Sequence, residues 1–516
     1  MTATAALPGR LPALWLRAER GLDKAAGGTV HNPLRHLGAL GFLCFWLLAI
    51  SGIILYAVLD TSATGAYRSI ADMSRLPWYL GGWLRSLHRY AADAFVVFTL
   101  AHLAREWLLG RYRGFRRFSW LTGVPLLLFV FACAIGGFWL NWDRLGQFSA
   151  IATAEWLDAL PLFGSPLTRN FIDVAAVSDR LFSLFVFVHL GVPLLLVFGL
   201  WFHVQRIARA AVFPPRPLAL AMTATLIALS IALPVVSQGP ADLAQAPVSV
   251  DLDWWLLFVH PLMYASSPIT VWLASGAALA LLFALPYLPQ PARPAVAVVD
   301  PANCNGCRRC FDDCPYAAIS MVPHPNARIG RQLAVVQADL CASCGICVGS
   351  CPSATPFRSV AELVTGIDMP QQPLDALRRQ LQHQLEAVAH ERPIVVFGCD
   401  RGAQVGALGG SSVTTISLIC IGQLPPSFIE YALRGGAAGV LVSGCRSCEY
   451  RLGARWTEER LGATREPRLR ASVPRERIAL AWADAGDEPR LRSALSALQD
   501  RVAALPAPAE ENAIHE

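Results

Sequence analysis

The sequence predicts a multidomain protein in which an all-α bundle of membrane-spanning helices precedes a small α+β domain and a doubly wound α/β domain. The first observation is composition: 54% of the 516 residues are hydrophobic and only 16% are charged, which is too apolar for a soluble protein. The second is distribution, because the long apolar stretches all lie before residue 290. The third is a group of cysteines behind them, followed by short apolar runs that alternate with helical stretches. The predicted domains are 1–292, 293–358 and 393–516, with a helical linker at 359–392.

Six stretches of the first domain are long enough to cross a bilayer, since about 20 apolar residues at ~1.5 Å each span its hydrocarbon core. They are 37–59, 86–109, 120–141, 181–204, 218–237 and 268–288. The net charge of +6 comes from basic residues that gather before the first span, between the second and third, and after the fourth. These places share one side of the membrane, which the positive-inside rule assigns to the cytoplasm. We therefore expect a multi-pass protein of the inner (cytoplasmic) membrane, with its N-terminus and cysteine-rich domains in the cytoplasm and no nucleic-acid partner.

Two cysteine runs of identical spacing follow the last span. Each reads Cys-x2-Cys-x2-Cys-x3-Cys-Pro, the pattern with which two-cluster ferredoxins hold two 4Fe-4S clusters, the fourth cysteine of each run binding the other cluster. Structural zinc is the alternative, but zinc sites combine two CxxC pairs across a longer gap. We expect one cluster on Cys304, Cys307, Cys310 and Cys351, and the other on Cys341, Cys344, Cys347 and Cys314. The small domain is then an α+β ferredoxin-like domain.

Four histidines of the predicted bundle form two pairs with equal spacing. His88 and His102 lie in the second span and His189 and His203 in the fourth, each pair 14 residues apart. This spacing is close to four helical turns, so the members of a pair share one helix face, ~21 Å apart along the axis. A lone intramembrane histidine is often an interhelical hydrogen-bond partner, but ionisable groups in hydrocarbon are costly enough to indicate function. We expect two b haems, His88 with His189 binding the outer one and His102 with His203 the cytoplasmic one.

Other residues of the bundle stand at fixed offsets from these histidines. Gly38 and Gly52, in the first span, are also 14 residues apart. Arg85 lies three residues before His88, and Arg105 three residues after His102. With this spacing of histidines, glycines and arginines, residues 31 to about 288 resemble the cytochrome b subunit of cytochrome bc complexes, truncated after its sixth helix. The resemblance implies that the glycines let haem pack against the backbone and that the arginines bind haem propionates.

A segment between the fifth and sixth spans combines Asp253 with Trp254 and Trp255. It resembles the Pro-Glu-Trp-Tyr segment that lines the outer quinol site of the cytochrome b family. The resemblance implies a quinone site at these three residues, in which Asp253, partly desolvated between aromatic rings, exchanges a proton with quinone. An aromatic belt at the membrane interface is the alternative interpretation of the tryptophans.

Two further segments carry the resemblance, and three positions depart from it. Gly137–Trp142 resembles the family's Gly-Tyr-Val-Leu-Pro-Trp motif, and Ala159–Gly164 resembles its next loop. Asp253 replaces the family's glutamate, and Asn141 replaces its proline. Ala208 stands where the family has a quinone-binding histidine on the cytoplasmic side. A cytoplasmic-side quinone site is therefore left open, and that face is expected to take electrons from the iron-sulfur domain instead.

The last domain places cysteines behind apolar runs. The runs 394–398, 415–419 and 439–443 are typical of buried parallel strands. Cys399, Cys420 and Cys445 each follow a run, where open α/β sheets bind their ligands, and Cys448 completes a CxxC with Cys445. Four thiolates at one edge suit an iron-sulfur cluster. Zinc or a redox CxxC remains the alternative.

The sequence around these cysteines includes Phe397-Gly-Cys-Asp400, Cys420-Ile-Gly-Gln-Leu-Pro425 and Gly444-Cys-Arg-Ser-Cys-Glu-Tyr450. It resembles the delta subunit of methyl-viologen-reducing hydrogenases, which passes electrons to flavoproteins of heterodisulfide-reductase type. The resemblance implies a 2Fe-2S cluster on all four cysteines and such a flavoprotein as the cytoplasmic partner. The preceding linker carries a leucine stripe that we expect to pack against its own neighbours, formed by Leu374, Leu377, Leu381 and Leu385.

Together these features predict a quinone-linked oxidoreductase subunit of a respiratory chain, which connects a cytoplasmic flavoprotein through iron-sulfur clusters and two b haems to the quinone pool. Twelve of the 14 cysteines fall into metal-ligand groups and only Cys44 and Cys133 lie in apolar helices, so a reducing compartment is implied. The alternative is a membrane anchor and electron wire for a dehydrogenase or hydrogenase, without a quinone site of its own. A redox sensor is disfavoured, since no signalling module is recognisable. The direction of electron flow, the quinone type and a homodimeric state are left open.

Overall fold

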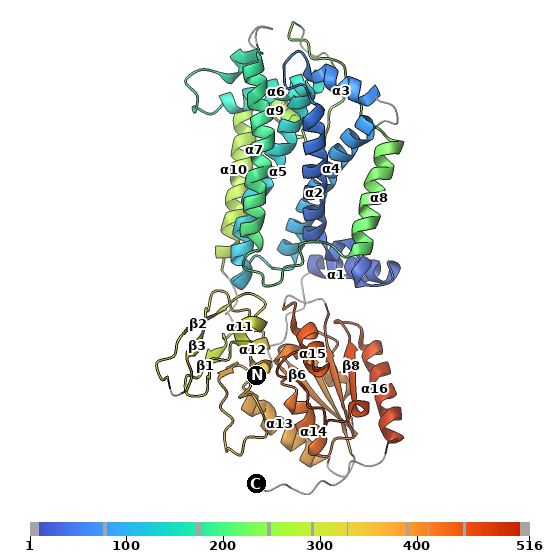
Figure 1. Ribbon diagram of the computed structural model, residues 1–516, viewed down its shortest axis with the longest axis vertical. Coiled ribbons are helices and arrows are strands. Elements are labelled where there is room, and N and C mark those ends of the chain that lie inside the picture. Colours follow the sequence, from blue (N-terminus) through green and yellow to red (C-terminus); the bar gives the residue numbers. More distant parts are fainter. Residues whose placement is uncertain are drawn as a thin grey trace. The chain divides into compact units, whose positions relative to one another are not determined.

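The computed structural model describes residues 10–75, 80–171, 177–244, 249–289, 294–327, 329–388, 392–410, 412–446 and 450–505. The chain divides into two compact units. The first comprises Met1–Gln205 and Ala210–Pro289, and the second comprises Arg206–Arg209 and Gln290–Glu516. Figure 1 shows the helices of the first unit and the mixed helices and strands of the second.

The first unit is built from helices. Helix α2 (Leu37–Val58) packs along α4 (Leu80–Leu108), and α5 (Arg117–Asn141) packs along α7 (Asp179–Val204) (Figure 1). These four carry the histidines singled out from the sequence and the glycines and arginines near them, whereas Asp253, Trp254 and Trp255 lie before α9. The remaining helices are α1 (Arg10–Ala25), α3 (Ala66–Arg75), α6 (Arg144–Asp158), α8 (Arg216–Ala232), α9 (Val259–Ala265) and α10 (Pro268–Ala284).

All six predicted spans are helical over most of their length, but four helical segments in the described part of the chain are long and apolar enough to cross a membrane. These are Leu37–Val58, Gly114–Asn141, Asp179–Val204 and Pro268–Tyr287. The other two predicted spans differ for different reasons: α4 is long but charged, and α8 has only 17 residues. The charges of α4 include Arg85, Arg89, Asp93 and Arg105, which face polar partners or the histidine sites described below.

The second unit begins with the cysteine-rich segment. Two short antiparallel pairs frame it: β1 (Val298–Val299) with β4 (Ile367–Asp368), and β2 (Ile319–Pro323) with β3 (Gln332–Val336). Each cysteine run ends in a short helix, α11 (Arg309–Asp313) or α12 (Ile346–Gly349). Glycines with positive φ close the tight loops before these helices, Gly306 at 70° and Gly345 at 74°.

A four-stranded parallel sheet forms the rest of the unit, in the order β6-β5-β7-β8. Its strands are β5 (Ile394–Cys399), β6 (Val413–Leu418), β7 (Gly439–Gly444) and β8 (Ile478–Trp482). Alternate residues of β5 belong to different cores. Val395 and Phe397 pack in the core that contains α13 (Leu374–Ala387) and α14 (Ser427–Arg434), whereas Ile394 and Val396 pack in the core of α16 (Glu488–Ala503). The sheet is therefore covered on both faces, as the doubly wound prediction requires.

The segment predicted as a linker contributes to this core. The four leucines of its stripe are buried on α13. They share one hydrophobic core with residues of the cysteine-rich segment, such as Cys347, and of the sheet, such as Val442. The cysteine-rich segment, α13 and the sheet thus form one folding unit, because the leucine stripe covers the sheet instead of bridging two separate bodies.

Candidate redox centres

The four histidines of the bundle lie in two facing pairs. The ring centroids of His88 and His189 are 6.3 Å apart, and those of His102 and His203 are 6.4 Å apart. In each pair one ring comes from α4 and the other from α7. Two metal–nitrogen bonds of about 2 Å each need ~4 Å between the nitrogens. The centroid separations leave this space once the distance from each ring centre to its nitrogen is included.

Hydrogen bonds from the neighbouring helices orient three of the rings. His189 Nδ1 donates to the carbonyl oxygen of Cys133 at 2.9 Å, so its Nε2 carries the lone pair that a metal needs. His88 Nδ1 lies 2.9 Å from Ser51 Oγ, and His203 Nδ1 lies 3.4 Å from Thr122 Oγ1. Because Nδ1 of each ring has a hydrogen-bond partner, Nε2 is free to bind a metal in the space between the helices.

A glycine lies beside each of the four rings. Cβ atoms built at Gly52 and Gly38 would lie 3.1 Å from His88 and 3.4 Å from His102. Cβ atoms built at Gly137 and Gly123 would each lie 3.0 Å from a ring atom, of His189 and His203 respectively. Only the first two glycines were expected to pack against haem. The spacing of 14 residues, repeated between Gly123 and Gly137 on α5, is the signal that could have revealed the other two.

Two cavities adjoin the His88–His189 pair. One, of about 370 Å³, has an apolar wall that includes Phe45, Phe95 and Val130. The other, of about 460 Å³, is more polar and is lined by Arg85 and Arg89 among others. A haem presents an apolar ring and charged propionates, so an apolar chamber continuous at the histidines with an arginine-lined one fits this group. Arg85 thus lines the polar cavity that adjoins His88 and His189.

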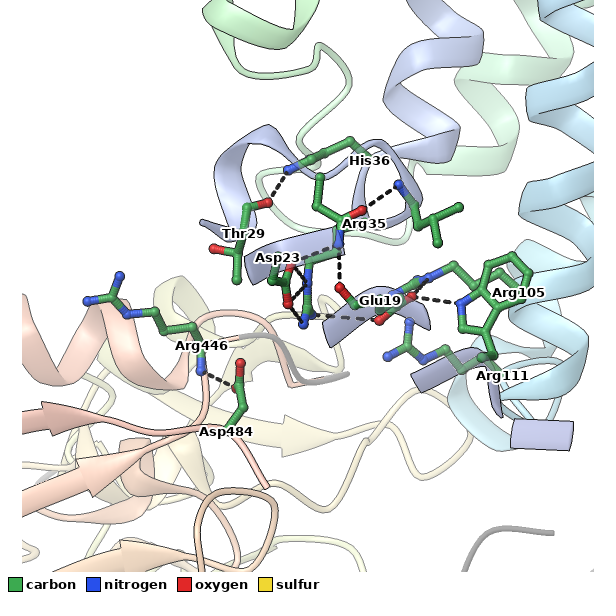
Figure 2. A network of polar contacts seen from close by, with 12 residues as sticks. Glu19, Asp23, Thr29, Arg35, His36, Arg105, Arg111, Arg446 and Asp484 are labelled. Atoms are coloured by element: carbon green, nitrogen blue, oxygen red, sulfur yellow. Dashed lines mark hydrogen bonds and ion pairs between the residues drawn. The ribbon is translucent and has the colours of Figure 1, made fainter. Parts of the chain in front are cut away.

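The other propionate candidate, Arg105, is paired with carboxylates of the chain itself. Its Nε donates to Glu19 Oε1 at 2.7 Å and its Nη1 to Glu106 Oε1 at 3.0 Å. Glu19, on α1, is only 1% exposed and also accepts from Trp15 Nε1 at 2.8 Å. Figure 2 shows Glu19 between Arg105 and the neighbouring Arg35–Asp23 pair. The sequence did not reveal this contact, because Glu19 lies 86 positions before Arg105.

Asp253 faces a cation that the sequence analysis did not single out. Its Oδ2 pairs with Arg89, which also pairs with Asp93 and lies 5.3 Å from the centroid of the Phe138 ring. Its Oδ1 accepts from the backbone N–H of Trp255 at 3.1 Å and of Leu256 at 2.8 Å. A guanidinium and two peptide N–H groups therefore hold this carboxylate, in a cavity that Tyr56, Tyr90 and Phe138 also line. The reason is the position of Asp253 on the wall of the 460 Å³ cavity, beside Arg89 of α4.

The two tryptophans lie differently from Asp253. Trp254 is 69% and Trp255 43% exposed within the chain. The cavity wall contributed by this segment consists of Asp251, Leu252, Asp253 and Leu256. Both tryptophans thus present their rings outward, as the interfacial-belt interpretation requires.

The two predicted sets of cluster ligands each gather around one small cavity. Cys304, Cys307, Cys310 and Cys351 line the first, and Cys314, Cys341, Cys344 and Cys347 line the second. Burial, together with the neighbouring thiols Cys351, Cys307 and Cys304, raises the pKa of the Cys310 thiol to about 12. Backbone N–H groups donate to sulfur in the second set, from Ala318 to Cys314 at 3.3 Å and from Ser343 to Cys341 at 3.4 Å. The donor sets, with thiolates from both runs at each cavity and N–H groups aimed at sulfur, fit iron-sulfur clusters.

The cysteines of the C-terminal sheet lie at the carboxyl ends of three neighbouring strands. Cys399 ends β5 and Cys445 follows β7, with their Sγ atoms 3.9 Å apart. The hydrogen bond with Cys445 lowers the pKa of the Cys399 thiol to about 6. Cys420 follows β6, and its Sγ lies 2.3 Å from where a Cβ at Gly453 would stand. The predicted fourth ligand, Cys448, lies outside the described residues. Across the part of the chain that the structure describes, no three histidine, cysteine, aspartate or glutamate side chains lie close enough together to hold a single metal ion.

Facing histidines in a helical bundle with apolar helices, followed by two cysteine-lined cavities, define a membrane protein for electron transfer. Comparison with protein families gives the same result in chain order. Residues 25–210 match the family cytochrome b/b6/petB, and residues 303–355 match the 4Fe-4S dicluster domain. Residues 394–506 match the delta subunit of methyl-viologen-reducing hydrogenase. The three predicted resemblances are confirmed, and the chain is a membrane electron-transfer subunit with haem and iron-sulfur parts.

Among solved structures, the chain is similar to one described as a hyperthermophilic respiratory Complex III. The identity is 20% and the TM-score 0.38, and the match covers 49% of this chain and 75% of that chain.

Proposed function

We propose that this chain is the membrane subunit of a quinone-linked oxidoreductase. Electrons pass between a cytoplasmic flavoprotein of heterodisulfide-reductase type, the C-terminal cysteine site, the two 4Fe-4S clusters, the cytoplasmic-side haem, the outer haem and a quinone near Asp253. The observation that carries the proposal is the combination, in one chain, of two facing histidine pairs with two cavities lined by four cysteines each.

Each group is assigned to the side chains whose positions or spacing support it. His88 and His189 would hold the outer b haem, with Gly52 and Gly137 beside the rings and Arg85 at the polar side. The cytoplasmic b haem would be held by His102 and His203, with Gly38, Gly123 and Arg105 nearby. The two sets of four cysteines would bind one 4Fe-4S cluster each, and Cys399, Cys420, Cys445 and Cys448 a 2Fe-2S cluster. When bound, these groups supply one-electron carriers.

Asp253 would supply the protons for quinone chemistry, and Arg89 the positive charge beside it. Quinone needs two protons with its two electrons, and a carboxylate on the wall of a cavity that also touches His88 and His189 can deliver them one at a time. The ion pair with Arg89 keeps the Asp253 carboxylate at the wall of this cavity. If quinone is reduced at the outer face, electrons from the cytoplasm move with the membrane potential and gain ~2.3 kcal/mol per charge per 100 mV. In the opposite direction, quinol oxidation builds the potential.

A membrane anchor and electron wire without a quinone site is the second candidate. The ion pair between Arg89 and Asp253 favours it, because a carboxylate held by a guanidinium and two peptide N–H groups is a stable structural arrangement. The outward position of Trp254 and Trp255 favours it as well.

A quinone-analogue titration of the purified full-length protein separates the two candidates. The quinone-linked enzyme predicts that a tight-binding analogue shifts the spectrum of the outer haem with saturable, one-site behaviour. The shift should be absent in His189→Ala, which removes that haem, and retained in His203→Ala. An unchanged haem spectrum at a saturating analogue concentration would contradict a quinone site. The membrane anchor and electron wire would then be the better candidate.

A further inference from the structure

Within the second unit, the loop of one cysteine set is packed directly against the C-terminal sheet. Helix α12, which carries Cys347, contacts the turn η10 (Ile421–Gln423) that follows Cys420. A Cβ built at Gly349 would lie 2.2 Å from the carbonyl oxygen of Gly422, and one built at Gly422 would lie 2.9 Å from Ile346 Cγ1. Neither glycine has room for a side chain. The two segments are thus held as close as backbones can approach.

The same junction includes the sulfur of Cys420. A Cβ at Gly453 would meet Cys420 Sγ at 2.3 Å and Gly422 Cα at 3.9 Å. Cys420 therefore lies beside the turn that contacts α12, and not on a remote part of the sheet edge.

Arg460, on α15 (Gly453–Leu461), binds both sides of the junction. It is 1% exposed, and its guanidinium donates to Asp313 Oδ2 at 2.6 Å, to the Gly422 carbonyl oxygen at 2.8 Å and to the Ile346 carbonyl oxygen at 3.4 Å. Asp313 directly precedes Cys314, and Ile346 directly precedes Cys347. One buried cation thus joins two ligand-bearing segments of a single cysteine set to the chain after Cys420.

The other cysteine set is packed differently. A Cβ at Gly306, in its loop, would meet the carbonyl oxygen of Gln332, and one at Gly366 would meet that of Asn303. Both contacts lie between the cysteine-rich segment and its own framing strand β3 or the residue before β4, and neither reaches the C-terminal sheet. Cys307 of this set is exposed, whereas Cys344 and Cys347 are only 7% and 8% exposed.

We propose that the cluster bound by Cys314, Cys341, Cys344 and Cys347 is the electron partner of the C-terminal cysteine site, and that Arg460 is the positioning residue that holds the two together and raises the reduction potential of this cluster. The inference rests on the proposed function and gives the order of its carriers. One electron moves in the step: the C-terminal centre is oxidised, the cluster is reduced, and no bond forms or breaks. A buried cation favours the more negative, reduced cluster, which is why its potential rises.

Potentiometric titration of the purified full-length protein, followed by electron paramagnetic resonance, tests the role of Arg460. In Arg460→Gln the midpoint potential of one 4Fe-4S cluster should become more negative, and in Asp313→Asn that of the same cluster should become more positive. Arg460→Lys, which keeps the charge, should stay closer to the parent value than Arg460→Gln. Opposite shifts from opposite charges cannot come from a loosened junction alone. Shifts in the same direction, or equal shifts of both clusters, would overturn the assignment.

A second measurement leaves Arg460 unchanged and tests the order of the carriers. In the fully reduced protein, magnetic coupling to the nearest cluster should broaden the signal of the C-terminal centre. Cys344→Ser should remove this broadening and Cys307→Ser should preserve it. The reverse result would overturn the order while the relay itself stands. A parent protein without iron-sulfur signals would instead refute the proposed function.

Discussion

Asp253 lies with its carboxylate against Arg89 on the wall of a cavity that also reaches His88 and His189. Its second oxygen accepts two backbone N–H bonds at the start of the following turn. Charge and hydrogen bonding at this residue can therefore be separated by substitution. Asparagine keeps an oxygen for the N–H groups but can neither pair with Arg89 nor carry a proton.

The first prediction is that Asp253→Asn lowers quinone-linked turnover by about 10² to 10⁴-fold, the usual contribution of a positioned general acid or base. Haem content should be unchanged, because the backbone contacts of the segment survive. Asp253→Glu should retain activity, since it keeps the carboxylate. Turnover is measured with purified protein and a soluble quinone. Parent-rate turnover in Asp253→Asn would support the electron wire instead.

The second prediction concerns a single methyl group beside a histidine. Gly137→Ala places a Cβ 3.0 Å from His189, so the ring must shift and the content of the outer haem should fall. Gly191→Ala is the matched control, because it also lies in an apolar helix but its Cβ would meet nothing within 4 Å. The haem-to-protein ratio of the two variants decides the matter. Equal ratios would show that the glycines do not shape the site.

Helix α1 is held against α4 by one buried carboxylate, that of Glu19. Glu19 accepts from Arg105 and Trp15, and it is almost fully buried although the helix otherwise exposes Leu11, Leu14 and Arg20. An ion pair between Glu19 and Arg105 therefore joins α1 to α4 (Figure 2).

The third prediction is that Glu19→Ala destabilises the docking of α1 by about 1–3 kcal/mol, because the partly buried Arg105 loses one of its two carboxylates. Arg17→Ala, an exposed position of the same helix, is the control and should change stability by less than about 0.5 kcal/mol. Protease cleavage at α1 as a function of denaturant measures the difference. Identical cleavage profiles would show that the pair contributes nothing.

Much of the element structure could be predicted from periodicity, while contacts between distant segments could not. The apolar runs that became β5, β6 and β7 are unambiguous, but β8 reads Ile478-Ala-Leu-Ala-Trp482 and its alanines suit a helix equally well. The leucine stripe of α13 was recognised, but not that it covers the sheet. Spacing alone placed the four histidines in facing pairs. The partners Arg89 and Glu19 were missed because each is one arginine or glutamate among many, and only the fold identifies its neighbour.

At the scale of the whole molecule, the second unit is one body in which the cysteine-rich segment and the C-terminal sheet share a core. The family matches report these as separate regions, 303–355 and 394–506. The buried Arg460 and the close glycine contacts join these two regions. They therefore fix the distance between the two cysteine sites. The two regions are therefore expected to unfold together, because they share one core.

The fourth prediction is that the purified protein contains about ten non-haem irons, from two clusters of four and one of two. Cys448→Ser should remove only the smaller share, because the two ferredoxin-like cysteine sets are complete without it. Iron analysis with zinc determined in the same sample provides the measurement. Stoichiometric zinc with about eight irons would make the C-terminal site structural.

The central claim is that the facing histidine pairs hold two b haems. Pyridine haemochrome assay of the purified protein, with protein determined in the same sample, tests it most directly. We expect two low-spin b haems per chain, falling to one in His88→Ala or His189→Ala and to one in His102→Ala or His203→Ala, with a different haem lost in each pair. One haem or none in the parent protein would contradict it.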